Sequence, residues 1–219
     1  MNHGVMKRLA GMAGAAVLVS SMLSACVGPL LVGGAMVGGT LVAVDRRTSG
    51  AQLDDEAIEV RAASQIRSNL GTRVRTSVTS YNRQVLLTGE VPNLQDKQRV
   101  EAVVKSVENV SSVVNELAVL NSPSLMDRSA DALLTGRVKA MLLDASDLQS
   151  NAFKVVTERN TVYLMGRVTQ READRATEVV RGTPGVQKVV RLLEIISEQE
   201  LQRLGTVPAG SAQPAGTKL

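Results

Sequence analysis

The residues best suited to covalent or metal chemistry are confined to the N-terminus of this chain. Its one histidine, His3, and its one cysteine, Cys26, both precede residue 27. The rest of the chain therefore has no imidazole or thiol for a Cys/His metal site, a Ser-His-Asp triad or a Cys-His dyad. Carboxylates such as Asp144, Asp147 and Glu158 could act as acids or bases, but no pattern places a pair of them in a pocket. We therefore predict a protein that is not an enzyme and that holds no metal and no dissociable cofactor.

Composition also argues against nucleic-acid binding. The 219 residues include 25 Lys+Arg and 21 Asp+Glu, a surplus too small for a protein that relies on neutralising phosphates. The three aromatic residues, Tyr81, Phe153 and Tyr163, are too few to form a stacking platform for single strands. The length suits one ordinary domain or two small ones.

The first 25 residues read as a signal peptide. Lys7 and Arg8 precede an apolar stretch, residues 9–22, that is too short to span a bilayer comfortably. The sequence Leu23-Ser24-Ala25-Cys26 follows, and it resembles the bacterial lipobox. The resemblance implies cleavage before Cys26 and attachment of diacylglycerol and an N-acyl chain to that cysteine. A signal peptide with a chance cysteine, or a buried free thiol, is the alternative interpretation.

Residue 27 and the tract after it bear on the compartment. Position 27 is Val, whereas Asp there resembles the inner-membrane retention signal of lipoproteins, so we expect an outer-membrane anchor that faces the periplasm. Residues 27–44 are uncharged and just reach the length of a transmembrane helix, but five glycines and Pro29 disfavour a helix. We interpret residues 26–52 as a lipidated cysteine and a membrane-hugging tether. A small-residue helix-packing face of the GxxxG kind is the alternative.

Beyond Asp45 the sequence repeats. Residues 85–91 and 162–168 align at an offset of 77, and deleting one residue near 92–94 shifts the offset to 76. At that offset Arg99, Val103, Val104, Val110, Val113 and Val114 fall on Arg175, Val179, Val180, Val186, Val189 and Val190. This predicts two modules, residues 53–120 and 126–197, joined by a linker at 121–125 and followed by a disordered tail at 198–219.

Each module has the pattern of an α+β fold with the order αββαβ. Apolar residues recur every four positions in an opening helix, two short strands bracket a polar turn, and a second helix leads to a Val-rich closing strand. We expect a three-stranded mixed sheet packed against two helices, with a parallel pair formed through the second helix. Gly89 and Gly166, near the ends of the second strands, are expected where the backbone needs unusual dihedrals or a close approach.

The combination of a strand ending in Gly-x-Val, an Arg/Ala/Val-rich helix and a Val-x-x-Val-Val strand resembles the BON domain, here present twice. With the lipobox and Asp45-Arg46-Arg47-Thr48, residues 23–197 resemble the dual-BON outer-membrane lipoproteins of the DolP (YraP) type. The resemblance implies two tandem BON modules without enzymatic activity. It also implies binding of anionic phospholipid and support of envelope integrity.

The family's lipid-binding surface is assigned to the first helix of the second module, here residues 127–143. With Val138 as the core direction, Leu133 lies about 140° away, on a face expected to be wet. Aligning Val138 with Ile66 puts Arg61 and Gly71 at the positions of Leu133 and Leu143, so the first module would lack the apolar pair. The candidate lipid-binding residues are Leu133, Gly136, Arg137, Lys139, Ala140 and Leu143.

Two functions remain open from the sequence. In the first, the second module reads anionic membrane: Leu133 and Leu143 insert, and Arg137 and Lys139 bind head groups. In the second, helical faces or strand edges dock a protein, such as outer-membrane assembly machinery, a cell-wall remodelling system or division-site envelope proteins. A third interpretation of Leu133 is simple: it packs against the first module or is an ordinary surface residue.

Overall fold

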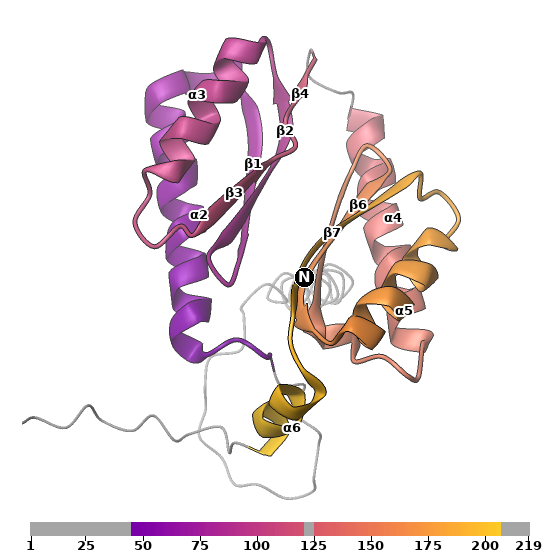
Figure 1. Cartoon of the computed structure of the whole chain (residues 1–219). Coiled ribbons are helices and arrows are strands. Elements are labelled where there is room, and N and C mark those ends of the chain that lie inside the picture. The colour runs from indigo at the N-terminus through magenta and orange to yellow at the C-terminus, as the bar shows by residue number, and fades with distance from the viewer. Residues whose placement is uncertain (1–44, 121–124, 207–219) are drawn as a thin grey trace, which may run out of the picture. The chain divides into compact units, whose positions relative to one another are not determined.

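The computed structural model describes residues 45–120 and 125–206 (Figure 1). The expected signal peptide, Cys26, the tether up to residue 44, the linker at 121–124 and the tail from 207 lie outside the described residues. Among the helices that are described, none combines the length and apolar character needed to cross a membrane.

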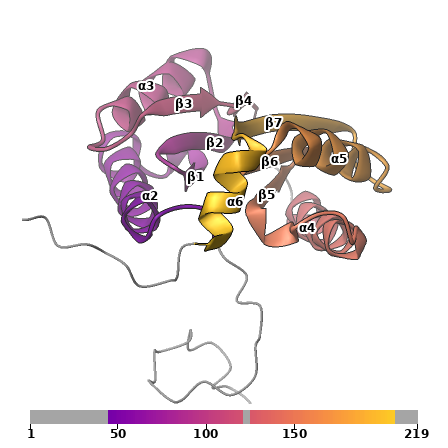
Figure 2. The ribbon, with the colours of Figure 1, turned by 60° about the horizontal axis from the view of Figure 1, so that its bottom comes forward.

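The first module has two helices and a small sheet, and Figure 2 shows both helices on one face of that sheet. The opening helix begins at Ser49, earlier than the expected module boundary at 53, because Thr48 caps it by accepting a hydrogen bond from the Ala51 N–H. The elements in order are α2 (Ser49–Leu70), the 3-10 turn η1 (Gly71–Arg73), β1 (Arg75–Tyr81), β2 (Gln84–Val91), α3 (Leu94–Lys105), β3 (Ser112–Asn115) and β4 (Ala118–Val119).

The second module repeats this order, which confirms the predicted αββαβ arrangement. The tail was expected to be disordered from residue 198, but the structure forms helix α6 (Glu198–Thr206) there, and Glu200 of this helix pairs with Arg167. The elements in order are α4 (Leu125–Asp144), η2 (Ser150–Ala152), β5 (Phe153–Glu158), β6 (Thr161–Val168), α5 (Gln170–Arg181) and β7 (Lys188–Ile195).

The two sheets have the same topology. β1 and β2 form an antiparallel hairpin, and β2 pairs in parallel with β3 and β4 after a crossover through α3. β5, β6 and β7 repeat this arrangement, with α5 in the crossover. The main difference lies in the closing strand: β7 is continuous over eight residues, whereas the corresponding strand of the first module is broken into β3 and β4.

Each module buries a core between its helices and its sheet. Ile58, Ala62 and Ile66 of α2 pack on the first sheet, and Leu134, Val138 and Leu142 of α4 pack on the second. A third cluster joins the opposite faces of the two sheets through Tyr81 and Leu86 from the first module and Tyr163 and Met165 from the second. All three clusters lie within residues 45–206, so a chain that starts at residue 45 retains them.

The two glycines expected at special positions have that role. A Cβ on Gly89, whose φ is +113°, would lie 2.2 Å from the carbonyl oxygen of Arg75. A Cβ on Gly166 would lie 2.4 Å from the carbonyl oxygen of Ala152. At both glycines the second strand of the hairpin therefore comes close to the backbone of the preceding segment, at Arg75 and at Ala152, as the sequence predicts.

Candidate lipid-binding face of α4

Helix α4 is held in a fixed rotation by its buried side. Leu134, Val138 and Leu142 are buried against β5, β6 and α5. Because these three side chains recur every four residues, the diametrically opposite side of the helix must face outward. The rotation of α4 therefore follows directly from its core residues.

The outward side of α4 carries two large apolar side chains. Leu133 is 68% exposed and Leu143 is 71% exposed. At 100° per residue, the direction midway between them lies about 180° from Val138. Leu133 therefore does not pack against the first module, and the interpretation of it as an ordinary surface residue stays open.

Small residues separate the two leucines. Gly136 and Ala140 lie on the same side of the helix, and an added Cβ on Gly136 would meet nothing within 4 Å. We call Leu133, Gly136, Ala140 and Leu143 the α4 stripe. Because the residues between the two protruding leucines are small, this side of the helix could approach a partner surface closely.

Basic side chains flank the α4 stripe on both sides. Arg137 and Lys139 are exposed and lie about 80° to either side of its centre at 100° per residue. Arg137 donates a hydrogen bond to the carbonyl oxygen of Pro184 at 3.3 Å, and neither residue has a carboxylate partner within the described part of the chain. Asp144, which the sequence analysis had not placed on this surface, is also exposed on the same side at the end of the helix.

The structure corrects the alignment of the two opening helices. Asp55 of α2 accepts hydrogen bonds from the N–H groups of the β1–β2 turn, and Asp131 of α4 does the same for the β5–β6 turn. Because Asp55 and Asp131 have the same role, they must be aligned with each other, which gives an offset of 76 between the helices. The alignment of Val138 with Ile66 gives 72 and is therefore wrong by about one helical turn. The first-module counterparts of Leu133 and Leu143 are therefore Ala57 and Arg67, not Arg61 and Gly71.

The corrected alignment also shows that α2 has exposed apolar residues of its own. Leu53 and Val60 are 67% and 70% exposed and point away from the first core. Their surroundings differ from those of the α4 stripe, because Arg61 is paired with Glu108 at 3.3 Å and Glu56 is exposed on the same side. The asymmetry between the modules is thus one of charge as much as of apolar surface.

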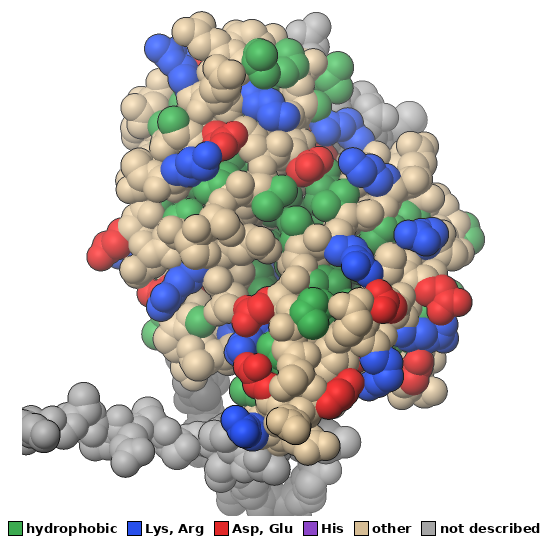
Figure 3. Space-filling model, viewed as in Figure 1, with side chains coloured by type: hydrophobic (Ala, Val, Ile, Leu, Met, Phe, Trp, Pro, Cys, Tyr) green, Lys and Arg blue, Asp and Glu red, His purple; other side chains and the backbone are tan. Residues whose placement is uncertain are grey.

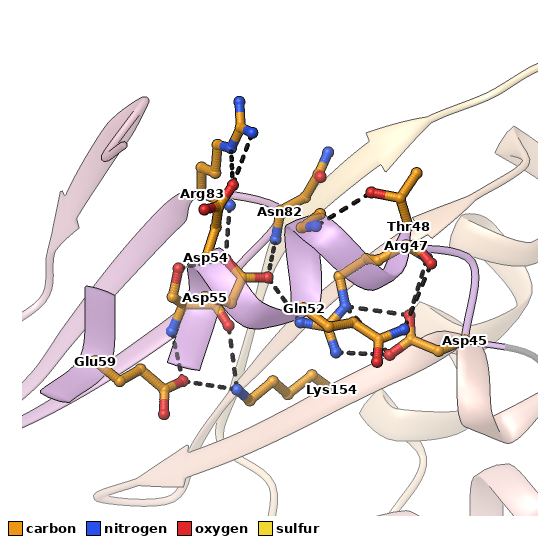
Figure 4. Close-up of polar contacts among 12 residues, drawn as sticks. Asp45, Arg47, Thr48, Gln52, Asp54, Asp55, Glu59, Asn82, Arg83 and Lys154 are labelled. Carbon is orange, nitrogen blue, oxygen red and sulfur yellow. Dashed lines mark hydrogen bonds and ion pairs between the residues drawn. The ribbon is translucent and has the colours of Figure 1, made fainter. Parts of the chain in front are cut away.

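Sequence reasoning missed a polar centre around Asp55 (Figure 4). The buried Asp55 carboxylate accepts from Ser80 Oγ at 2.6 Å, from Arg47 at 2.7 Å and from the two turn N–H groups. Burial alone would raise the pKa of Asp55, but these donors outweigh it and hold the pKa below its ordinary value. The recurrence of Asp at positions 55 and 131 was the available sequence signal.

The segment before α2 joins the two modules. Arg46, which is 3% exposed, donates two hydrogen bonds of 2.8 Å to Glu172 at the start of α5. Its neighbour Arg47 binds Asp55 and lies over the ring of Tyr81, 4.4 Å from the centroid. Two adjacent arginines thus bind different modules.

No group of carboxylates, histidines or cysteines in the described residues is arranged to hold a metal ion. On the face shown in Figure 3, Lys and Arg side chains are interspersed with Asp and Glu. The charge on this face is therefore mixed, in line with the small overall surplus of +4.

Comparison with known proteins identifies the family. The BON domain matches residues 54–121 and 130–197. The chain belongs to the BON-domain family. The outer membrane lipoprotein DolP of Haemophilus influenzae is 34% identical over 198 residues, which cover 90% of this chain and 100% of that one.

Two further relatives are similar in sequence to part of this chain. The 21 kDa hemolysin of Actinobacillus pleuropneumoniae is 32% identical over 70% of this chain and 80% of its own. Osmotically-inducible protein Y of Escherichia coli is 32% identical over 63% of this chain and 70% of its own. Together with the tandem match, these similarities confirm the resemblance drawn from the sequence: the chain is a dual-BON outer-membrane lipoprotein of the DolP type.

Proposed function

We propose that the second BON module binds anionic phospholipid through the α4 stripe, and that this contact serves a non-enzymatic role in envelope integrity. The observation that supports it is the placement of two exposed leucines opposite the helix core, with Arg137 and Lys139 on either side, neither of which has a carboxylate partner among the described residues. A surface of this kind lies in the membrane interface with its apolar side chains toward the acyl region.

The expected intrinsic affinity is weak. A fully buried Leu contributes about 1.5–3 kcal/mol, and a basic residue near an anionic surface contributes about 1 kcal/mol. Partial insertion of Leu133 and Leu143, opposed by Asp144, should leave a contact that is useful only at high local concentration. The lipid chains expected on Cys26 would supply that concentration by keeping α4 close to the membrane.

Co-sedimentation of residues 45–219 with vesicles tests this function without the anchor. We expect binding to vesicles that contain phosphatidylglycerol, weaker binding as salt is raised, and none to pure phosphatidylcholine. Leu133→Glu should reduce binding by about tenfold or more because it places a carboxylate in the stripe. Val60→Glu on α2, at a residue of equal exposure, is the matched control and should bind as the original chain does.

Equal losses from Leu133→Glu and Val60→Glu would show that general charge, and not the α4 stripe, governs binding. Equal binding to anionic and neutral vesicles would contradict the role of Arg137 and Lys139. No binding to either vesicle would leave membrane attachment to the expected anchor alone.

A protein adaptor is the second candidate function. The observation that favours it is the outer edge of β7, which pairs with no strand among the residues that the structure describes. In this role the protein would dock outer-membrane assembly machinery, cell-wall remodelling enzymes or division-site envelope proteins. The two functions use different surfaces and are compatible in one molecule.

A further inference from the structure

The two sheets have four edge strands, and three of them are closed or interrupted. On β1, the Ser80 N–H donates to the Glu59 carboxylate at 2.8 Å, and the Ser80 carbonyl accepts from Lys154 at 3.1 Å. Lys154 and Glu158 of β5 both bind residues of the first module. Side chains thus occupy the positions that a new strand would need along this side of the molecule.

The edge formed by β3 and β4 is broken. The strand stops at Asn115, whose side chain accepts from the Leu117 N–H and donates to the carbonyl of Lys97. Pairing with β2 resumes for only two residues in β4. Short and interrupted edges of this kind resist the addition of another strand.

β7 is more open than these edges, although the side chain of its Glu194 accepts a hydrogen bond from Asn82 of the first module at 2.6 Å. It is eight residues long, contains no proline or glycine, and pairs with β6 alone among the described strands. Within residues 45–120 and 125–206, no side chain is hydrogen-bonded to its backbone. All eight residues remain at least partly exposed, although the central strand β6 is almost entirely buried.

The register shows which backbone groups are available. Ile196 N–H donates to the carbonyl of Val168, so the even-numbered residues of β7 direct their N–H and C=O groups toward β6. The odd-numbered residues, Val189, Arg191, Leu193 and Ile195, direct theirs to the open edge. An extended segment could therefore pair with β7, most freely at its N-terminal half, because Leu192, Leu193 and Glu194 line a hollow together with residues of the first module.

The cations beside this edge that lack a carboxylate partner favour an acidic occupant. A trough of ≈410 Å³ lies between α5 and β7. It is lined by Arg181 and Arg191 and by two carboxylates, Asp174 and Glu178, each of which is already bound to an arginine. Arg191 is bound to Asp174 at 2.8 Å, whereas Arg181 and Lys188 have no carboxylate partner in the described part of the chain. A second copy of β7 would bring further basic side chains to this edge. The C-terminal segment 207–219 contains two prolines and no acid, which suits it poorly to strand pairing.

We propose that β7 is a docking edge for an extended, acidic segment of another protein, which adds a fourth strand to the sheet of the second module. The backbone of the odd-numbered residues provides the hydrogen bonds. Lys188 and Arg181 select acidic side chains on the segment that joins, and the trough beside α5 receives a side chain from its inward face. This inference rests on the adaptor function proposed above, whereas it does not depend on lipid binding, because the site lies on a different element from the α4 stripe.

The test uses synthetic peptides and residues 45–219, which include every packing cluster described above. The probe is an acetylated peptide of alternating Thr and Val with two Glu residues, and its counterpart has Lys in place of Glu. We expect the acidic peptide to slow hydrogen exchange at the amides of Val189, Arg191 and Leu193. It should bind about fivefold more tightly than the basic one, as expected for two exposed ion pairs.

A matched pair of variants separates backbone pairing from charge. Arg191→Pro removes an outward N–H without removing a hydrogen bond to β6, and edge strands tolerate proline in that orientation. Arg191→Ala loses the same side chain but keeps the N–H. We expect Arg191→Pro to weaken acidic peptide binding about tenfold relative to Arg191→Ala.

Thermal unfolding and vesicle co-sedimentation of both variants, each expected to match the original chain, would show that the modules remain folded. Leu133→Glu should bind the peptide normally, so failure of the lipid proposal would not count against this one. Equal binding by Arg191→Pro and Arg191→Ala would overturn strand addition. Unchanged exchange in the original chain would do the same. Protection of the three amides by self-association alone would identify a second copy, and not an acidic partner, as the occupant.

Discussion

The two modules share their local geometry but differ in the contacts that extend beyond each module. In both, an aspartate on the opening helix holds the turn of the hairpin, Asp55 in the first and Asp131 in the second. In both, an acid at the start of the second helix binds an arginine, and these acids are Asp96 and Glu172. The repeated parts maintain the fold, whereas the partners beyond them distinguish the modules.

The two arginines differ in their separation from the acid along the sequence and in their burial. Asp96 takes Arg73 from its own module, and this arginine is half exposed. Glu172 takes Arg46 from ahead of the first module, and both side chains are 3% exposed. The second module therefore depends on a segment that its own sequence does not contain. This shows how a repeat can keep one local motif and use it for a long-range connection in a single copy.

The largest difference should appear when the turn-holding aspartates are removed. Asp55→Ala leaves Arg47, Ser80 and two N–H groups with a lost acceptor, so we expect a loss of about 3–5 kcal/mol in unfolding free energy. Asp131→Ala loses two backbone hydrogen bonds at a less buried site and should cost about 1–2 kcal/mol. Urea unfolding of residues 45–219 measures both. Equal losses would mean that the extra donors around Asp55 add nothing.

Removal of the arginines that bind Asp96 and Glu172 should change the unfolding free energy by almost as different amounts. Arg46→Ala leaves Glu172 buried without its cation, at an expected cost of about 3–5 kcal/mol. Arg73→Ala removes a partly exposed cation and should cost less than about 1 kcal/mol. Urea unfolding again provides the measurement, with Arg73→Ala as the control. A small effect of Arg46→Ala would show that the connection between the modules does not depend on this pair.

A helix-face exchange sharpens the comparison of α4 with α2. Leu133→Ala with Leu143→Arg gives α4 the residues found at the same positions of α2, Ala57 and Arg67. Loss of two partly inserted leucines should weaken binding to anionic vesicles, and the added arginine, which gains about 1 kcal/mol near an anionic surface, should limit the net loss to about threefold. Unfolding free energy should change by less than about 0.5 kcal/mol because both sites are exposed. Undiminished vesicle binding by the exchanged helix would exclude the leucines as the contact.

The smallest expected effect is a pH dependence at the contact between the modules. Burial raises the pKa of Glu158 above its ordinary value of 4.5, and neighbouring Glu90 adds to the shift, although Arg75 opposes it. The folded chain therefore binds this proton first, so the contribution of Glu158 to stability increases as pH falls from neutral toward 4.5. Asp55 and Glu172 have lowered pKa values, and the stability they contribute is lost as pH falls below their ordinary values of 3.8 and 4.5.

Glu158→Gln should remove the gain near pH 5 and leave the loss at lower pH unchanged. Urea midpoints at several pH values between 7 and 3 report both trends. An identical pH profile for the variant and the original chain would show that Glu158 does not titrate with a raised pKa.

The sequence alone determined the class of protein and the repeated fold. The alternation of apolar residues and the repeat at offset 76–77 were sufficient for two αββαβ modules, because core packing requires apolar side chains at fixed helical and strand periods. Gly89 and Gly166 were also identifiable, since only glycine fits where another carbonyl approaches the Cβ position. The outward orientation of Leu133 followed from the same periodicity.

The tertiary structure alone decided the contacts between distant residues. Local sequence does not show that Arg46 reaches Glu172, because the two are separated by 126 residues and no periodicity links them. It also led to an alignment of the opening helices that was wrong by one turn, since a period of four residues looks the same after a shift of four. The roles of Asp55 and Asp131 resolved that ambiguity, because each carboxylate must lie where the N–H groups of its own turn converge.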